Sequence, residues 1–198
     1  MGSKALRGRE NWQNQSGQKG GKAELQFFNV LQDYFEGTDY RIREKPREFK
    51  DIYSNVELDP QTLDQIYNPN ETWSHGIIPD YAIDNLRSRK TIYTEVKSQD
   101  GWVEGKERKA GRGNVHERSN KYFTPGLQKI LREKGGLSED VLPFWVVFQG
   151  DIARDPKRVR EISLWYEGIE GHFLLWHDST NPTQLLNHFD NFIVPILD

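Results

Sequence analysis

Apolar positions near the start of the chain recur at helical spacing and predict a helix over residues 22–35. Residues 1–21 are polar and rich in glycine, and we expect them to form a flexible N-terminal arm. A short second helix is predicted to begin at Asp59-Pro60, because proline fits the first turn of a helix. The apolar positions that define the two helices are Leu25, Phe28, Leu31 and Phe35 in the first and Leu63 and Ile66 in the second.

Short runs of β-favouring residues predict strands at residues 39–45, 77–83 and 91–97, with the turn-forming pair Asp84-Asn85 between the last two. A continuous apolar run at residues 143–148 is typical of a central strand that is covered on both faces. Two more strands are predicted at residues 160–166 and 173–176.

Helices are predicted at residues 114–122, from Thr124-Pro125 to Gly135-Gly136, and at residues 183–192, whereas residues 101–113 have the composition of a loop. This mixture of elements predicts an α/β fold, a three-layer sandwich in which helices flank a central mixed β-sheet. Because the chain has 198 residues and no internal repeat, we expect residues 1–198 to form one domain.

Composition narrows the class of protein. The absence of cysteine excludes disulfides and thiolate metal sites and is compatible with the cytoplasm. No run approaches eighteen consecutive apolar residues, so we expect no membrane span. The net charge of -3 argues at first against a nucleic-acid partner, but residues 104–134 carry nine Lys or Arg against four acids. Residues 162–198 carry five acids and no Lys or Arg, and could serve in packing, dimerisation or solubility. Charge alone favours the simpler interpretation that these residues form a solvated face.

The predicted strand at 91–97 brings together residue types that suit phosphodiester hydrolysis. Side chains two apart share a face of a strand, so Glu95 and Lys97 point the same way, and Asp80 on the preceding run could approach across a hairpin. Two carboxylates can hold Mg²⁺ while leaving places for water and phosphate oxygens. A lysine beside them can position the water or stabilise the transition state.

The tripeptide Glu-x-Lys is weak evidence by itself, because about one copy is expected by chance in a chain of this composition. It occurs at residues 48–50, 95–97 and 104–106, and only the middle copy lies in an alternating run that follows a Pro-Asp pair. A surface salt bridge on a hairpin explains the same residues equally well when they are taken alone.

Residues 111–121, which we call the reading segment, combine a glycine-rich loop with the start of a helix. Asn114 could cap that helix with Glu117 reaching back to it. Alternatively, the two could read base edges with Arg118, because Asn suits adenine, Glu an amino group and Arg guanine. Lys121 would hold backbone phosphates. His116 is expected to be a packing or phosphate neighbour, because no second histidine lies at metal-ligand spacing.

Long blocks of the chain resemble the MunI-like type II restriction endonucleases, which belong with EcoRI-like enzymes to the PD-(D/E)xK nuclease fold. The resemblance covers most of the chain and is strongest over residues 79–162. The matching blocks are Pro79-Asp80, Glu95-Val96-Lys97, Gly101–Lys106, Ala110–Asn114, His116–Ser119, Phe123–Leu127, Leu142–Phe148 and Arg154–Ile162.

The resemblance implies a homodimer that cuts both strands of a six-base palindrome in double-stranded DNA with Mg²⁺ and leaves four-base 5′ overhangs. It implies a bacterial cytoplasmic enzyme whose site a cognate DNA methyltransferase also recognises. The preferred target is C^AATTG, and GAATTC is the alternative. By the matching positions, Asp80 and Glu95 are metal ligands and Lys97 is the catalytic lysine. The expected DNA contacts are Arg112 at the outer pair, Gly113, Asn114, Val115, His116, Glu117, Arg118 and Lys121.

One position departs from the family pattern, because Val115 stands where the family has alanine. The added bulk is expected to alter the backbone approach to DNA or a methyl contact with a central base pair. Two other functions remain open at this stage. One is a repair or junction-resolving nuclease on the same fold, which would not need so many base readers. The other is a catalytically silent DNA-binding protein, which would not need the acid, acid, lysine set.

Overall fold

The computed structural model describes residues 21–67, 73–101, 103–107 and 114–198, and a single mixed β-sheet organises this part of the chain. The strand order is β1-β2-β3-β4-β5, with antiparallel pairing from β1 to β3 and parallel pairing from β3 to β5. The mixed sheet and the flanking helices confirm the predicted fold class. The strands are β1 Tyr40–Glu44, β2 Tyr81–Asn85, β3 Lys90–Ser98, β4 Phe144–Gln149 and β5 Phe173–Trp176.

Strand β4 is the predicted central strand, and all six of its residues are buried. It lies between β3 and β5 and is parallel to both, so each of its edges is hydrogen-bonded and each of its faces is covered. A strand in this position must be apolar on both faces, which is why it reads as a continuous run in the sequence.

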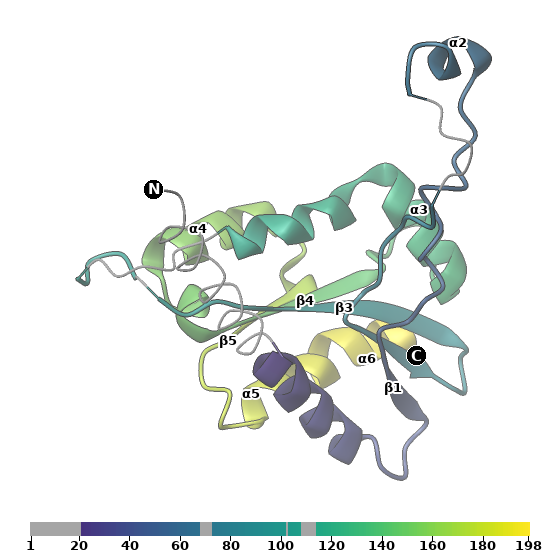
Figure 1. Cartoon of the computed structure of the whole chain (residues 1–198). Helices are drawn as coiled ribbons and strands as arrows, with labels where there is room; N and C mark the ends of the chain where they lie inside the picture. Colours follow the sequence, from purple (N-terminus) through teal and green to yellow (C-terminus); the bar gives the residue numbers. More distant parts are fainter. Residues whose placement is uncertain (1–20, 68–72, 102, 108–113) are drawn as a thin grey trace.

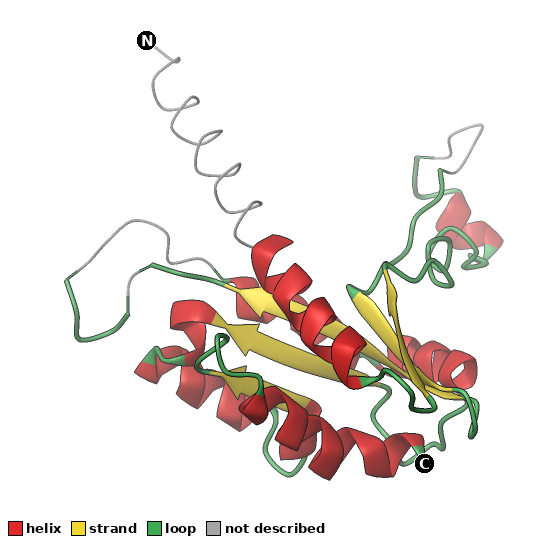
Figure 2. Ribbon diagram, turned by 90° about the horizontal axis from the view of Figure 1, so that it is seen from below, coloured by secondary structure: helices red, strands yellow, loops and turns green. Residues whose placement is uncertain are grey.

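One face of the sheet is covered by the two ends of the described chain. The helix at residues 21–34 and the C-terminal elements lie together on this side, purple and yellow in Figure 1, and Figure 2 views them in front of the strands. The predicted first helix is confirmed, but Phe27 and Leu31 face the core while Leu25 is 54% exposed. The C-terminal elements are α5 Thr183–His188, a π-helical turn at Phe189–Ile193 and α6 Val194–Leu197.

The opposite face is covered by a 3₁₀ helix, η1 (Val115–Phe123), and by the helices α3 (Pro125–Gly135) and α4 (Pro156–Trp165), green in Figure 1. Helix α3 begins at Pro125, as predicted, and it ends at Gly136, whose φ of 62° is the left-handed conformation that terminates a helix. The helix predicted at residues 114–122 is present as the 3₁₀ helix η1.

The strand predicted at residues 160–166 is wrong, because residues 160–165 belong to α4 and Tyr166 is the C-cap of this helix. Asp155 caps this helix by accepting a hydrogen bond from the Lys157 N–H, and Pro156 occupies its first turn. Alternate apolar residues suggested a strand, but Ile162 and Tyr166 are one helical turn apart and buried, whereas Leu164 between them is 69% exposed. The spacing of four residues, rather than two, decides which side chains enter the core.

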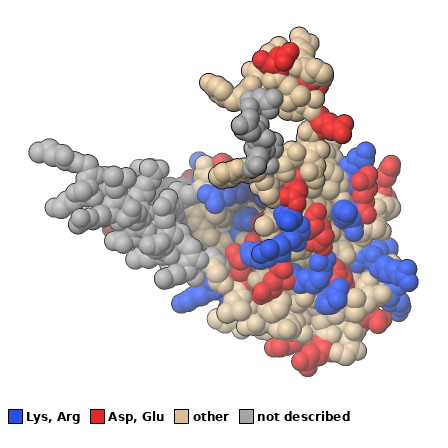
Figure 3. Space-filling view, turned by 45° about the vertical axis from the view of Figure 1, so that its right-hand side comes forward, with Lys and Arg blue, Asp and Glu red and all other residues tan. Residues whose placement is uncertain are grey.

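A segment between β1 and β2 projects away from the sheet (Figures 1 and 3). It carries α2 (Pro60–Leu63), and Asp59 caps this helix by accepting a hydrogen bond from the Thr62 N–H. The predicted helix start is therefore confirmed, but the helix ends before Ile66. Residues 51–67 contain four acids and no Lys or Arg. No helix among the described residues is long and apolar enough to cross a membrane.

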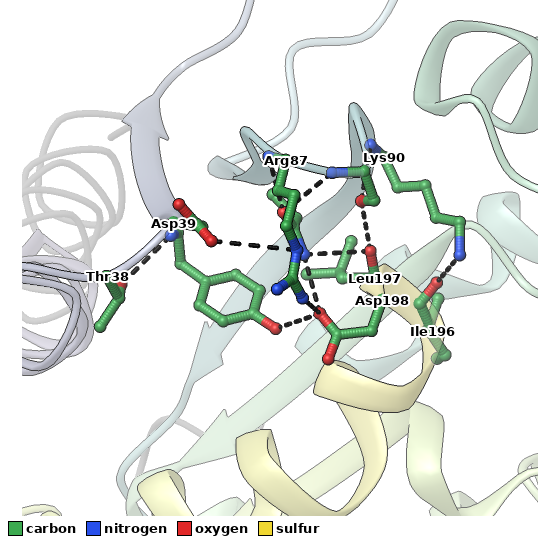
Figure 4. A network of polar contacts seen from close by, with 10 residues as sticks. Thr38, Asp39, Arg87, Lys90, Ile196, Leu197 and Asp198 are labelled. Atoms are coloured by element: carbon green, nitrogen blue, oxygen red, sulfur yellow. Dashed lines mark hydrogen bonds and ion pairs between the residues drawn. The ribbon is translucent and has the colours of Figure 1, made fainter.

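The C-terminal residues close over the turn between β2 and β3 (Figure 4). Asp198 Oδ1 accepts hydrogen bonds from the Tyr40 hydroxyl and the Asn85 side-chain amide, each at 2.8 Å. Lys90 Nζ donates to the Ile196 carbonyl oxygen at 3.3 Å. Of the roles considered for the acidic C-terminal region, its final residues therefore serve packing, because they hold the hairpin that carries the functional site.

Helix α3 packs so closely on β3 that Gly135 has no room for a side chain. A Cβ atom at Gly135 would lie 2.4 Å from the Thr91 carbonyl oxygen, whereas one at Gly126, in the same helix, would meet nothing within 4 Å. We therefore expect Gly135→Ala to lower the free energy of unfolding by about 1–3 kcal/mol. Urea denaturation of Gly135→Ala and of the matched control Gly126→Ala measures this. Equal stability of the two variants would show that the helix–strand contact is not tight.

Candidate active site

The hairpin of β2 and β3 brings the two predicted carboxylates together. Asp80 directly precedes β2, and the register that pairs Tyr81 with Thr94 sets Asp80 beside the next residues of β3. The Val96 N–H donates to Asp80 Oδ2 at 2.9 Å, and the Asp80 and Glu95 side chains interact directly. Both carboxylates are buried, with exposures of 8% and 4%. The expected approach of Asp80 across the hairpin is confirmed.

Lys97 completes the group from the same face of β3 as Glu95. Its Nζ donates to Glu95 Oε2 and lies 3.6 Å from Asp80 Oδ2. Val96, between them in sequence, packs in the core on the other side of the sheet. The lysine side chain is only 15% exposed, so its ammonium charge acts on both carboxylates with little screening by water.

The pKa values of the two carboxyl groups shift in opposite directions. Burial is the largest influence on the pKa of Asp80 and would raise it, but the Lys97 charge and the hydrogen bonds from Lys45 and Val96 bring it below its ordinary value. Burial also dominates at Glu95, and together with the neighbouring Asp80 it outweighs Lys97 and raises the pKa. Two like charges that share a buried site behave in this way, because ionising one opposes ionising the other.

Lys45 and Glu24, which the sequence did not indicate, extend this group on one side. Lys45 Nζ lies 2.6 Å from Asp80 Oδ1 and 2.9 Å from Glu24 Oε2, so it bridges β1 and the helix at residues 21–34 to the site. Lys45 directly follows Glu44, the last paired residue of β1, and only the order of strands in the sheet reveals that it lies beside Asp80.

Tyr122 and Lys121 border the site on the other side. The buried Tyr122 hydroxyl donates to Glu95 Oε1, and Lys121 Nζ is 3.5 Å from the same oxygen. Burial and the Glu95 charge raise the pKa of Tyr122, so the phenol stays protonated and remains a donor. The sequence placed Lys121 among the phosphate contacts, and the structure places it at the edge of the carboxylate group.

The donor set at this site fits a hard divalent cation. Mg²⁺ prefers oxygen ligands and is commonly held by one or two carboxylates, with water and phosphate oxygens completing its shell. Asp80 and Glu95 supply those two carboxylates. Within the described ranges, no cluster of three or more His, Cys, Asp or Glu side chains forms a fuller protein cage. Two carboxylates leave most of the coordination shell of such a cation to other oxygen ligands.

The other two Glu-x-Lys copies lie in turns rather than in strands. Glu48 forms an ion pair with Arg43 at 2.7 Å, and Lys50 lies 3.7 Å from its neighbour Asp51. In the third copy, the Glu104 backbone N–H donates to Asp155. The copy in β3 differs from both in that its glutamate is buried and interacts with Asp80 and with the Tyr122 hydroxyl.

Gly111, Arg112 and Gly113 of the reading segment lie outside the described residues. The structure describes its remaining residues, and it contradicts the predicted cap. Among the described residues, the Asn114 side chain makes no capping bond to η1, and its Oδ1 accepts from Arg158 Nη2 at 3.0 Å instead. Capping fails because the competing donor is a charged guanidinium, which forms a stronger hydrogen bond than a neutral backbone N–H.

The expected base readers divide into exposed and buried side chains. Asn114, Glu117 and Arg118 are exposed, and Val115 is half-buried against the α3 and α4 side of the core. His116 is fully buried and stacks on Trp165 with ring centroids 5.1 Å apart. The position of His116 agrees with the packing role considered for it, and its ring is not available on the surface of this state.

Comparison with known proteins gives one consistent result. The family model for the type II restriction enzyme MunI matches residues 1–198. The chain is 46% identical over 202 residues to the type II restriction enzyme MunI of a Mycoplasma species, and the match covers 100% of both chains. It is also similar to the crystal structure of MunI restriction endonuclease in complex with cognate DNA, with a TM-score of 0.80, 46% identity and coverage of 95% of this chain and 98% of that chain. The chain belongs to the MunI family of type II restriction enzymes, which are DNA-cleaving hydrolases.

Proposed function

We propose that this restriction endonuclease binds double-stranded DNA as a homodimer and hydrolyses both strands at C^AATTG with Mg²⁺, leaving 5′-AATT overhangs. The observation that carries the proposal is the path of the reading segment, whose first described residue, Asn114, is exposed and whose last residue, Lys121, reaches Glu95. Base recognition and bond cleavage would thus be linked within one short stretch of chain. The similar MunI structure was solved with its cognate DNA, which supports the same class of ligand here.

Asp80 and Glu95 would hold the Mg²⁺. When bound, the ion stabilises charge that develops on the phosphate and lowers the pKa of bound water. Lys97 would direct its ammonium group at the scissile phosphate and the attacking water, because its Nζ already lies between the two carboxylates. Tyr122 would hold Glu95 in position and favour its ionised form by donating to Oε1.

Specificity would come from Asn114, Glu117 and Arg118, which can address the edges of the central AATT pairs. Arg112 is the proposed reader of the outer C·G pair, and Gly113 and Val115 would set the approach of the backbone. A homodimer fits the proposal because a two-fold axis relates the halves of a palindrome and the two scissile bonds.

Cleavage of plasmid DNA tests the proposal directly. We expect linear plasmid incubated with the protein and Mg²⁺ to give discrete fragments, and sequencing of the ends to return 5′-AATT overhangs at CAATTG. Ends at GAATTC would contradict the assignment of the outer pair. Preferred cutting of branched DNA would favour a junction-resolving nuclease, and no cutting with any divalent metal or salt concentration would favour a silent DNA-binding protein.

We expect Lys97→Ala to reduce the cleavage rate by at least about 100-fold, because it removes the positive group beside the reacting phosphate. Specific binding of the CAATTG duplex in Ca²⁺ should persist. Single-turnover cleavage and a gel-shift titration measure the two properties. Lys50→Ala, from another Glu-x-Lys copy, is the matched control and should cut at the wild-type rate. A normal rate for Lys97→Ala would exclude Lys97 from catalysis.

Tyr122→Phe is expected to shift the pH dependence of cleavage to higher pH. Mg²⁺ requires ionised Glu95, whose pKa is already raised, so activity falls as the pH drops through that pKa. Removing the Tyr122 donor destabilises the charged carboxylate and raises the pKa further. Rates measured across pH at subsaturating Mg²⁺ should show the shift, and high Mg²⁺ should restore the wild-type rate. An unchanged profile would mean that the hydrogen bond does not act on Glu95.

A further inference from the structure

We propose that Arg158 is a positioning residue for base recognition, which fixes the orientation of the Asn114 side-chain amide. This inference rests on the proposed reading of adenine by Asn114. Arg158 lies on α4, and its Nη2 donates to Asn114 Oδ1 at 3.0 Å. The arginine side chain is 13% exposed, whereas Asn114 is exposed. A mostly buried guanidinium thus holds an amide that lies at the surface.

The guanidinium is itself held in place by its neighbours on α4. Its Nη1 donates to Glu161 Oε2 at 2.6 Å, one helical turn farther along. The same carboxylate oxygen lies 3.0 Å from His116 Nε2, and His116 stacks on Trp165 at an interplanar angle of 10°. Residues 158, 161 and 165 lie on one face of α4, because three and seven positions return to the same side of a helix.

His116 enters this arrangement as a neutral ring. Burial and the nearby Arg158 charge lower its pKa, although Glu161 opposes the shift. When Nε2 carries the proton, it donates to Glu161 Oε2, and Arg158 Nη1, which lies 3.1 Å from the same ring nitrogen, donates to Glu161 and not to the ring. The Glu161 carboxylate then accepts from both His116 and Arg158. Because His116 is two residues from Asn114, α4 fixes the backbone of the reading segment as well as the amide.

The effect on recognition follows from the two faces of an amide. The Asn side chain has nearly the same shape in both flipped forms, but only Oδ1 can accept from a guanidinium. The hydrogen bond with Arg158 therefore selects one form before DNA binds. Oδ1 has a second lone pair for the adenine N6–H, and Nδ2 remains able to donate to adenine N7. An amide free to flip would present the wrong pattern to adenine part of the time.

A binding cycle on the full-length protein tests this role. The variant is Arg158→Met, which keeps the aliphatic stem and removes the guanidinium. Affinity is measured in Ca²⁺ for a CAATTG duplex, for duplexes in which each adenine in turn is replaced by purine, and for a duplex without the site. Purine lacks the N6 amino group, so it removes the contact that Oδ1 would make. Urea denaturation establishes that each variant is folded.

The wild-type protein should lose about 10-fold in affinity when purine replaces the adenine that Asn114 reads, the scale of one base contact. In Arg158→Met this loss should fall below about 3-fold, with weaker specific binding and unchanged binding to DNA without the site. Arg158→Lys keeps the charge without the forked donors and should behave as an intermediate. Arg160→Met removes an exposed cation from the same helix. This variant should lose as much affinity as the wild-type protein when purine replaces the adenine, and we call this loss of affinity the purine effect.

Three results would overturn the inference. The first is a purine effect of wild-type size in a folded Arg158→Met or Arg158→Lys variant. The second is an equal fall in affinity for specific and non-specific DNA while the purine effect keeps its wild-type size. This result would make Arg158 a phosphate contact. The third is the absence of any purine effect in the wild-type protein, which would mean that Asn114 does not read an adenine. Failure of the wild-type protein to prefer any AATT site would instead contradict the proposed function.

Discussion

The hydrogen bond between the Val96 N–H and Asp80 Oδ2 is the contact on which the site depends. It joins the residue before β2 to the C-terminal part of β3, and it brings a second carboxylate next to Glu95 in a buried position. Two buried carboxylates repel each other and lose hydration, so they stay together only when cations and donors surround them. Lys97 and Lys45 supply the charge, and Tyr122 supplies a further donor.

The rest of the fold serves to keep this hairpin in place. β4 is buried on both faces and pairs with β3 along the length that carries Glu95 and Lys97. The C-terminal residues hold the turn of the hairpin, and α3 packs against β3 at Gly135. A buried charged site needs such support, because any movement that separates the carboxylates from their partners leaves charge without compensation.

The 3₁₀ helix η1 connects this site to the surface that is proposed to read DNA. Lys121 and Tyr122, near its end, contact Glu95, and Asn114, directly before it, is held by Arg158 of α4. A shift at either end would therefore be transmitted over nine residues. In the proposed function, this one helix would connect the base contact of Asn114 with the carboxylate of Glu95.

Much of the fold was predictable from local patterns. The buried strand β4, the α3 boundaries and the approach of Asp80 to Glu95 follow from apolar runs, glycine and proline positions, and alternation. The strand predicted at residues 160–166 failed because Ile162, Leu164 and Tyr166 alternate in the sequence while only the first and last are buried. No sequence pattern indicated Glu24 or Lys45, since their place beside Asp80 depends on the order of strands and on a helix packed across them.

The central claim is that Asp80 and Glu95 form one cation site, and calorimetric titration of Ca²⁺ tests it without relying on cleavage. The titration is performed on the protein bound to a CAATTG duplex, with Glu104→Gln, from a Glu-x-Lys copy in a turn, as the control. The account predicts that Asp80→Asn and Glu95→Gln each weaken Ca²⁺ binding by at least about 10-fold, the scale of losing one charged ligand contact. Wild-type Ca²⁺ affinity in either variant, with the control also unchanged, would contradict it.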